Sequence, residues 1–351
     1  MEYLSYSYLA PAKVNFILKI GEKNPTNNLH SIFSIIRRIS IFDKVTFKIN
    51  EDKNKLKNVP GEAIINQLTK KELQEYTENL EKELSNDKNL IIKASNLFFN
   101  KINLKNKYIN AIIEKNIPVQ AGLGGGSSDA AGMLNILNKI YNNPLNYNEL
   151  NNIAMKLGSD VSFFLKKKDS FVAGNGEIIK SISRKSLKKY YITVIVPKFG
   201  ISTKEAYDAF DDLVLTKKIN YYNIFNLNFN YNFDKLNIKN ENNFEDIDLK
   251  NCINLSMNLK CENDFEHVIL NKYPVLKKIK NSLMQKKIKK NMKAELAMLS
   301  GSGSAIFGVF KTKKDAVIYL HSIGKKRFSS QIKFKFLGET NFKGKLNQLQ
   351  N

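Results

Sequence analysis

Two segments of the chain combine glycine and serine at a density that suits phosphate binding. Glycine lets the backbone turn sharply and approach a ligand closely. The N-terminus of a following helix adds unpaired N–H donors and partial positive charge. The longer segment runs directly into a helical apolar pattern and contains Pro118, Val119, Gln120, Ala121, Gly122, Leu123, Gly124, Gly125, Gly126, Ser127 and Ser128. It predicts a phosphate-binding loop, and the alternative is a turn that only caps the helix.

The second segment, Ser300–Ser304, alternates serine with Gly301 and Gly303 around Ser302 and lies between two apolar strands. Taken alone, it is equally typical of a hairpin turn. The presence of two glycine-serine loops in one chain favours phosphate binding for both. The longer loop has neither the spacing of a P-loop nor a confirmed dinucleotide fingerprint.

Three polar residues stand where they could serve catalysis. Lys13 and Asn15 alternate with Val14 and Phe16, so they share one face of a predicted strand. That face either meets solvent or presents a cation and an amide to a cleft. Asp160 follows a Gly-Ser break and precedes an apolar run. An acid in this place most often caps a helix, and the functional alternative is a carboxylate that accepts the proton of a substrate hydroxyl.

The elements that must position these residues follow from hydrophobic periodicity. Alternation predicts strands at 6–20, with a bend at Pro11, and at 45–49. The highly charged stretches 51–58 and 70–88 are expected to be surface connections. Further along, the pattern predicts helices at 89–101, 128–141 and 147–157, and strands at 108–114, 170–173 and 190–196.

The C-terminal half predicts a helix at 275–292, a strand–turn–strand at 295–310, and a last helix and strand. Between the halves, asparagine occupies ten of the 34 positions from 217 to 250, which indicates a loosely ordered low-complexity insertion. The mixture predicts an α+β protein whose two halves join within 165–190. We expect domains at 1–180 and 181–351, the second containing the insertion.

Composition narrows the class of protein. The chain has 351 residues, 42% of them apolar, which excludes wholesale disorder. Two cysteines and three histidines argue against a disulfide framework or a multi-histidine metal centre. The absence of a long apolar run or a basic leader favours a cytoplasmic protein without membrane partners. The net charge of +23 raises the question of a nucleic-acid partner.

Taken together, the motifs resemble those of the GHMP kinase superfamily. Three of them occur in order, PAKVN at 11–15, PVQAGLGGGSSDAA at 118–131 and LSGSGSAIF at 299–307. Two further segments, GSDVSF at 158–163 and NDFE at 263–266, point to the branch that acts on a cytidyl diphosphate of methylerythritol. The resemblance implies an N-terminal domain like that of ribosomal protein S5, a C-terminal α+β domain, and an active site in the cleft between them.

The resemblance also implies transfer of the γ-phosphoryl group of ATP, with Mg²⁺, to the 2-hydroxyl of that small-molecule substrate. Asp160 would be the catalytic acid/base and Lys13 its electrostatic partner. The loop Pro118–Ser128 would wrap the ATP phosphates. The substrate would be held by Asn15, His30, Tyr207, Gly301, Ser302 and Gly303. No set of metal ligands is evident from the sequence.

The chain departs from the family's motifs at one position, and three alternative functions also fit parts of the sequence. Leu29 stands where the family usually has a tyrosine that stacks on cytosine, so cytidine recognition is expected to be weaker or redistributed. The chain could instead be another GHMP kinase, of the homoserine or mevalonate type, or a non-catalytic nucleotide-binding relative. A nucleic-acid binder would rest on eight lysines within 277–293. We favour a solvated helix face there, because no arginine or aromatic residue interleaves.

Overall fold

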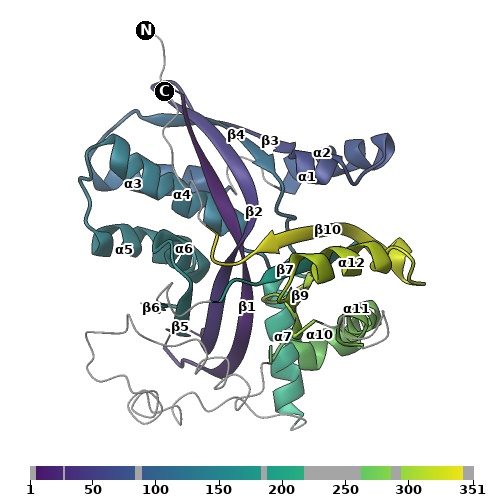
Figure 1. Ribbon diagram of the computed structural model, residues 1–351. Coiled ribbons are helices and arrows are strands. Elements are labelled where there is room, and N and C mark those ends of the chain that lie inside the picture. The colour runs from purple at the N-terminus through teal and green to yellow at the C-terminus, as the bar shows by residue number, and fades with distance from the viewer. Residues whose placement is uncertain are drawn as a thin grey trace.

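The protein is built on two β-sheets that share a hydrophobic core (Figure 1). The computed structural model describes residues 5–26, 28–83, 89–182, 188–216, 262–285 and 294–342. The first sheet contains β1 (Tyr6–Lys23), β2 (His30–Asn50), β3 (Lys55–Pro60), β4 (Tyr108–Lys115), β5 (Ser170–Gly174) and β6 (Ile178–Ser181). The second contains β7 (Tyr191–Pro197), β8 (Leu296–Leu299), β9 (Ile306–Phe310) and β10 (Ile332–Glu339).

The long strands β1 and β2 run antiparallel through the middle of the molecule (Figure 1). Their register sets Lys13 opposite Arg38 and shifts between Pro11 and Ala12, so the predicted bend is a bulge within one continuous strand. One end of β2 pairs with β5 and the other with β4, and β3 pairs parallel to β4. The second sheet is antiparallel throughout, in the order β10-β7-β9-β8.

Helices cover each sheet. On the first, α3 to α6 pack together on one side of β1 and β2 (Figure 1). On the second, α7 and α10 to α12 enclose a separate core. The described helices are α1 (Glu62–Ile65), α2 (Lys70–Glu83), α3 (Leu90–Lys101), α4 (Gly125–Ile140), α5 (Tyr147–Leu157), α6 (Ser159–Leu165), α7 (Thr203–Leu215), α10 (Glu266–Lys272), α11 (Pro274–Met284) and α12 (Lys313–Ile323), and a 3₁₀ turn spans Ser329–Gln331.

β1 is buried on both faces, which the predicted alternation did not reveal. Val14 and Phe16 enter the core shared with the second sheet, whereas Leu18 and Ile20 join the core of α7 and α10 to α12. Lys13 and Asn15 are also buried, at 4% and 3% exposure. Of the two expectations for this polar face, solvent or cleft, the solvent face is therefore wrong.

The charged stretches 51–58 and 70–88, expected to be surface connections, contain regular structure instead, and residues 84–88 lie outside the described residues. Lys55–Pro60 is strand β3, paired with β4, and Lys70–Glu83 is helix α2. Helix α2 buries Tyr76 and Leu80 against the core between the sheets. Two apolar residues four positions apart suffice to anchor a helix whose other faces are charged.

Other boundaries also differ from prediction. Helix α4 begins at Gly125, because Gly124 adopts a left-handed conformation and serves as its N-cap. Helix α11 ends at Met284, since Gln285 has an extended backbone. The short strand β6 was not predicted. The insertion at 217–250 lies outside the described residues, as do 286–293 of the lysine run. None of the described helices is long and apolar enough to cross a membrane.

Candidate active site

The predicted phosphate loop is shaped by left-handed backbone at alternate positions. Gln120, Gly122 and Gly124 have φ angles of 53°, 72° and 71°. Helix α4 then starts at Gly125, so Gly125, Gly126 and Ser127 form its first turn. The N–H groups of a first helical turn have no partner within the helix, and the helix dipole adds partial positive charge there. The loop and helix together form an end that is suited to anions, and phosphate binding there stays a prediction.

The second glycine-serine loop packs against the first. The Ser300 hydroxyl donates to the Gly122 carbonyl oxygen at 2.9 Å, and the Ala305 N–H donates to the Ala121 carbonyl oxygen at 3.2 Å. A Cβ on Gly122 would lie 1.9 Å from the Ser300 carbonyl oxygen. The two loops therefore touch through their backbones, and only glycine at 122 permits this approach.

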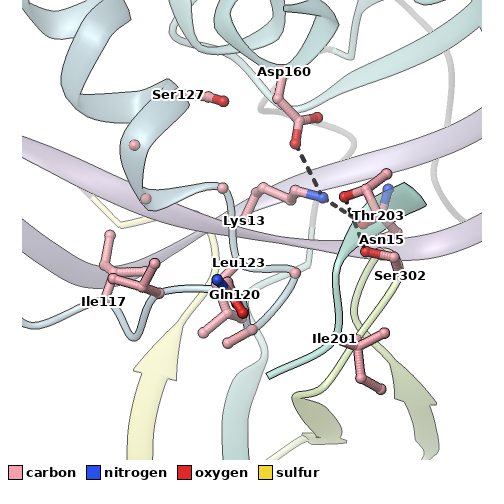
Figure 2. A pocket seen from close by; sticks show the side chains of 18 of the residues that line it. Lys13, Asn15, Ile117, Gln120, Leu123, Ser127, Asp160, Ile201, Thr203 and Ser302 are labelled. Atoms are coloured by element: carbon pink, nitrogen blue, oxygen red, sulfur yellow. Dashed lines mark hydrogen bonds and ion pairs between the residues drawn. The ribbon is translucent and has the colours of Figure 1, made fainter. Parts of the chain in front are cut away.

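Lys13 and Asp160 meet above this pair of loops (Figure 2). The Lys13 Nζ lies 2.9 Å from Asn15 Oδ1 and 3.4 Å from Asp160 Oδ2. Asp160 lies in the first turn of α6, where Gly158 is the N-cap, so the expectation of a capping role for Asp160 is wrong. The lysine side chain is only 6% exposed and the aspartate 35%, which leaves the carboxylate accessible from the cavity.

A cavity of about 530 Å³ joins these parts. It is lined by the loop from Pro118 to Ser127, by Lys13, Asn15 and Asp160, and by Gly301–Gly303. Tyr207 on α7 and Phe265 close another part of it. The structure thus brings most of the sequence-predicted site residues to one cavity, which lies where the two sheets meet. Ser128 is buried at 2% exposure and does not line the cavity.

His30 lies behind Tyr207 and does not line the cavity itself. The two rings stack with centroids 4.9 Å apart and planes 10° apart, and Phe265 contacts Tyr207 edge-on. The ring nitrogens of His30 lie 2.8 Å from the Gly21 carbonyl oxygen and 3.1 Å from Asp211 Oδ1. The His30 side chain is therefore placed to hold Tyr207, and its direct contact with substrate stays a prediction.

Tyr207 presents its ring in a buried setting. Burial, followed by the nearby charges of Asp160 and Asp211, raises the pKa of Tyr207 to about 12. The phenol is therefore neutral at physiological pH and offers a flat apolar face with one hydroxyl. Leu29, at the position where the resemblance implies a stacking tyrosine, is 54% exposed.

Asn263 has a structural role in the site that its NDFE motif did not reveal. Asn263 is 1% exposed, and its Nδ2 donates to the carbonyl oxygens of Leu299 and Gly301 at 2.9 and 2.7 Å. The adjacent backbone also pairs with β1, because the Asp264 N–H donates to the Leu18 carbonyl oxygen. Asn263 therefore ties the second loop to the strand that carries Lys13. The NDFE motif marked the position, but it could not reveal the role of Asn263 because Leu299 and Gly301 are distant in sequence.

The described residues do not form a dedicated metal site. No three histidine, cysteine or acidic residues gather among them. The two carboxylates that line the cavity, Asp129 and Asp160, are each paired with a lysine, Lys115 and Lys13. Mg²⁺ is commonly held by phosphate oxygens and water with only one or two protein groups. An ion that entered with a nucleotide would accordingly be held largely by the phosphates.

Family models and sequence relatives identify the proteins that this chain is similar to. The family model for the GHMP kinases N terminal domain matches residues 89–168, and that for the GHMP kinases C terminal matches residues 247–328. The chain is 32% identical to the 4-diphosphocytidyl-2-C-methyl-D-erythritol kinase of Fusobacterium nucleatum over 86% of this chain and 87% of the relative. It is 36% identical to that of Clostridium botulinum over 64% of this chain and 70% of the relative.

Solved structures agree on the fold. A crystal structure of 4-(cytidine 5'-diphospho)-2C-methyl-D-erythritol kinase matches 95% of this chain and 98% of its own, with a TM-score of 0.62 and 21% identity. A homoserine kinase from Cytophaga hutchinsonii matches 97% and 95%, with a TM-score of 0.59 and 16% identity. The motifs, the two-sheet fold with its shared cavity and the curated relatives place this chain in the GHMP kinase superfamily, among the 4-diphosphocytidyl-2-C-methyl-D-erythritol kinases.

Proposed function

We propose that this protein transfers the γ-phosphoryl group of ATP to the 2-hydroxyl of 4-diphosphocytidyl-2-C-methyl-D-erythritol. The observation that carries the proposal is the pairing of Lys13 with Asp160 beside the glycine-rich end of α4, within one cavity. That cavity offers an anion site, a cation and a carboxylate to a single reaction. These are the parts that phosphoryl transfer requires of a protein.

The reaction assigns a task to each group. The substrate hydroxyl oxygen bonds to the γ-phosphorus, the bond from that phosphorus to the bridging oxygen breaks, and ADP leaves. Asp160 accepts the hydroxyl proton. Lys13 neutralises charge that spreads over the transferring group, and the N–H groups of the loop and α4 hold the phosphates in place. When bound, Mg²⁺ would neutralise phosphate charge.

Lys13 is well placed for its task because its surroundings fix it. Its backbone N–H donates to the Leu123 carbonyl oxygen at 2.9 Å, so the strand carrying the lysine is bonded to the phosphate loop. Asn15 accepts from Nζ and donates in turn to the Ser34 hydroxyl at 2.8 Å. A side chain held from several sides needs no reordering when the reaction begins.

On the substrate side, Tyr207 offers an aromatic face for a base, with His30 stacked behind it. Aromatic stacking on a base contributes about 1–3 kcal/mol in nucleic-acid complexes. Leu29 offers only apolar contact on its side, so we expect Tyr207 to carry more of the cytidine recognition. Ser302, 3.3 Å from the Thr203 hydroxyl, borders the same space.

A turnover assay tests the proposal. The purified protein is given ATP and, separately, the cytidyl-methylerythritol substrate, homoserine and mevalonate, with Asp160→Asn alongside. We expect phosphorylation of the first substrate alone and a loss of ~10²–10⁴-fold in kcat for the variant. Turnover of homoserine or mevalonate instead would refute the substrate assignment. Nucleotide binding without turnover of any substrate would favour a non-catalytic relative.

A further inference from the structure

A cluster of three charged side chains is buried beneath the phosphate loop and takes no part in the proposed chemistry. Asp43 on β2, Lys115 at the end of β4 and Asp129 on α4 are 0%, 2% and 3% exposed. Lys115 Nζ donates to Asp43 Oδ2 and, at 2.8 Å, to Asp129 Oδ2. Lys115 and Asp129 also form part of the cavity lining. We call these three residues the buried triad.

The triad holds the phosphate loop at both of its ends. Where the chain enters the loop, Asp43 Oδ1 accepts hydrogen bonds from the N–H groups of Asn116 and Ile117 at 2.6 and 2.8 Å. Where the chain leaves it, Asp129 lies one turn into α4. A Cβ at Gly125, the first residue of that helix, would lie 3.3 Å from Asp43 Oδ2. The charges therefore lie directly beneath the anion-binding end.

The charges of the triad do not balance. Two carboxylates share one ammonium group, which leaves one excess negative charge when both acids are ionised. Tyr8 on β1 also reaches the cluster, where its hydroxyl donates to the Asp129 carbonyl oxygen at 2.6 Å, and burial holds the Tyr8 pKa well above its usual value. Tyr8 therefore adds no compensating charge. Among the described residues, Asp129 Oδ1 is a buried atom without a hydrogen-bond partner.

We propose that nucleotide binding at this loop is coupled to uptake of a proton by the buried triad, at Asp129. The inference rests on the proposed function only in taking a nucleoside triphosphate as the ligand of the loop. An incoming polyphosphate is opposed by the excess negative charge beneath it, and one proton removes that charge. Asp129 keeps one oxygen, Oδ1, without a hydrogen-bond partner, and once protonated the Asp129 carboxyl can donate a hydrogen bond to the neighbouring Asp43 carboxylate.

The charges around Asp129 support the assignment of the proton to this residue. Burial raises its pKa, Lys115 lowers it, and the neighbouring Asp43 raises it again, to about 7. The pKa of Asp43 is also raised by burial, although Lys115 and two backbone N–H groups oppose the shift. Of the two acids, Asp43 is the better stabilised as an anion, because both of its oxygens are hydrogen-bonded. Asp129 is therefore the acid that changes charge near neutral pH.

Calorimetry with the non-hydrolysable analogue AMP-PNP measures the coupling directly. Titrations at pH 7.5 in two buffers of different ionisation enthalpy give the number of protons taken up per nucleotide. We expect Asp129→Asn to take up fewer protons than wild type, by up to about one per nucleotide. We also expect wild-type affinity to weaken up to about tenfold from pH 6.5 to 8.5, beyond any change in the variant. The nucleotide's own titration is common to both proteins and cancels.

Glu114→Gln supplies the matched control, because Glu114 precedes Lys115 in β4 and pairs at 2.9 Å with Lys44 on the exposed face. It removes a carboxylate from an ion pair without touching the triad, so its proton uptake should equal that of wild type. Equal uptake by wild type and Asp129→Asn would overturn the inference. Infrared spectroscopy of wild type gives a second measurement that does not depend on the variant's folding, since a protonated-carboxyl band should grow when AMP-PNP is added. Its absence would also overturn the inference.

These outcomes separate the inference from the proposed function. Tight AMP-PNP binding without the difference in proton uptake leaves the kinase activity standing and removes only the coupling. Failure of wild type to bind AMP-PNP at any pH from 6.5 to 8.5 would refute both. Failure to phosphorylate the cytidyl-methylerythritol substrate, with binding and coupling intact, would refute the substrate assignment alone.

Discussion

The position of Lys13 leaves room for an ammonium group and for little more. Its Nζ lies 3.2 Å from the place that a Cβ on Gly301 would occupy, and its stem lies close to Gly124. An arginine carries the same charge on a larger planar group that cannot enter this space. We therefore predict that Lys13→Arg lowers kcat by ~10²-fold or more, with a smaller effect on the KM for ATP.

Lys19→Arg is the control for this prediction in steady-state assays. Lys19 lies in the same strand, is similarly buried and pairs with Asp264 at 3.0 Å, outside the cavity lining. It should keep a kcat close to that of wild type. A Lys13→Arg enzyme with nearly normal kcat would show that charge alone suffices at this position.

Single residues were predictable from the sequence where local spacing carried the information. Lys13 and Asn15 alternate with apolar neighbours, which placed both on one face of a strand, although the alternation did not reveal that this face is buried. Asn263 and Lys115 were not assigned, because their partners at Gly301 and Asp129 become neighbours only in the folded chain. His30 was assigned from its motif position, but that position does not reveal that the Tyr207 ring stacks on it and separates it from the cavity.

At the scale of the element, the contact between the two glycine-serine loops is the most demanding feature. Gly122 combines a φ of 72° with a Cβ position 1.9 Å from the Ser300 carbonyl oxygen. Left-handed backbone costs a non-glycine residue about 1–3 kcal/mol, and the clash adds to this. We predict that Gly122→Ala lowers the free energy of unfolding by at least that amount and raises the KM for ATP about tenfold or more.

Gly126→Ala tests whether that effect is specific to the loop contact. Gly126 lies four residues away within helix α4, and the nearest atom to its Cβ position is Leu90 Cδ1 at 3.9 Å. Alanine in a helix is up to about 1 kcal/mol more favourable than glycine. Urea unfolding should therefore find this variant at least as stable as wild type. Equal stability of the two variants would contradict the close approach of the loops.

Helices and strands were predicted correctly where one hydrophobic periodicity dominated the sequence. Their prediction failed where charged residues concealed that periodicity. Helix α3 and strand β4 match their predictions closely. Helix α2 was missed because its charged residues outnumber the two, Tyr76 and Leu80, that anchor it. Strand β3 was missed for a similar reason, since its stability comes from parallel pairing with β4, a strand distant in sequence.

For the whole molecule, the buried triad predicts a pH dependence of stability. Asp129 has a pKa of about 7 in the folded protein, against an ordinary value of 3.8. Between these values the folded state holds a proton that the unfolded chain has released. Raising the pH therefore disfavours folding at this site, by up to about 1.4 kcal/mol per pH unit. The loss ends above pH 7, where both states are ionised.

The difference in unfolding free energy between wild type and Asp129→Asn isolates the contribution of the Asp129 proton to stability, because the variant cannot bind that proton. In urea titrations, wild type should lose about 2–3 kcal/mol of unfolding free energy relative to Asp129→Asn between pH 5 and pH 7. The same comparison with Glu114→Gln, whose ion pair is exposed, should stay nearly flat. A difference that rises with pH would mean that the triad stabilises Asp129 as an anion. The phosphate loop would then rest on a fixed negative charge, and nucleotide binding would have no proton to take up there.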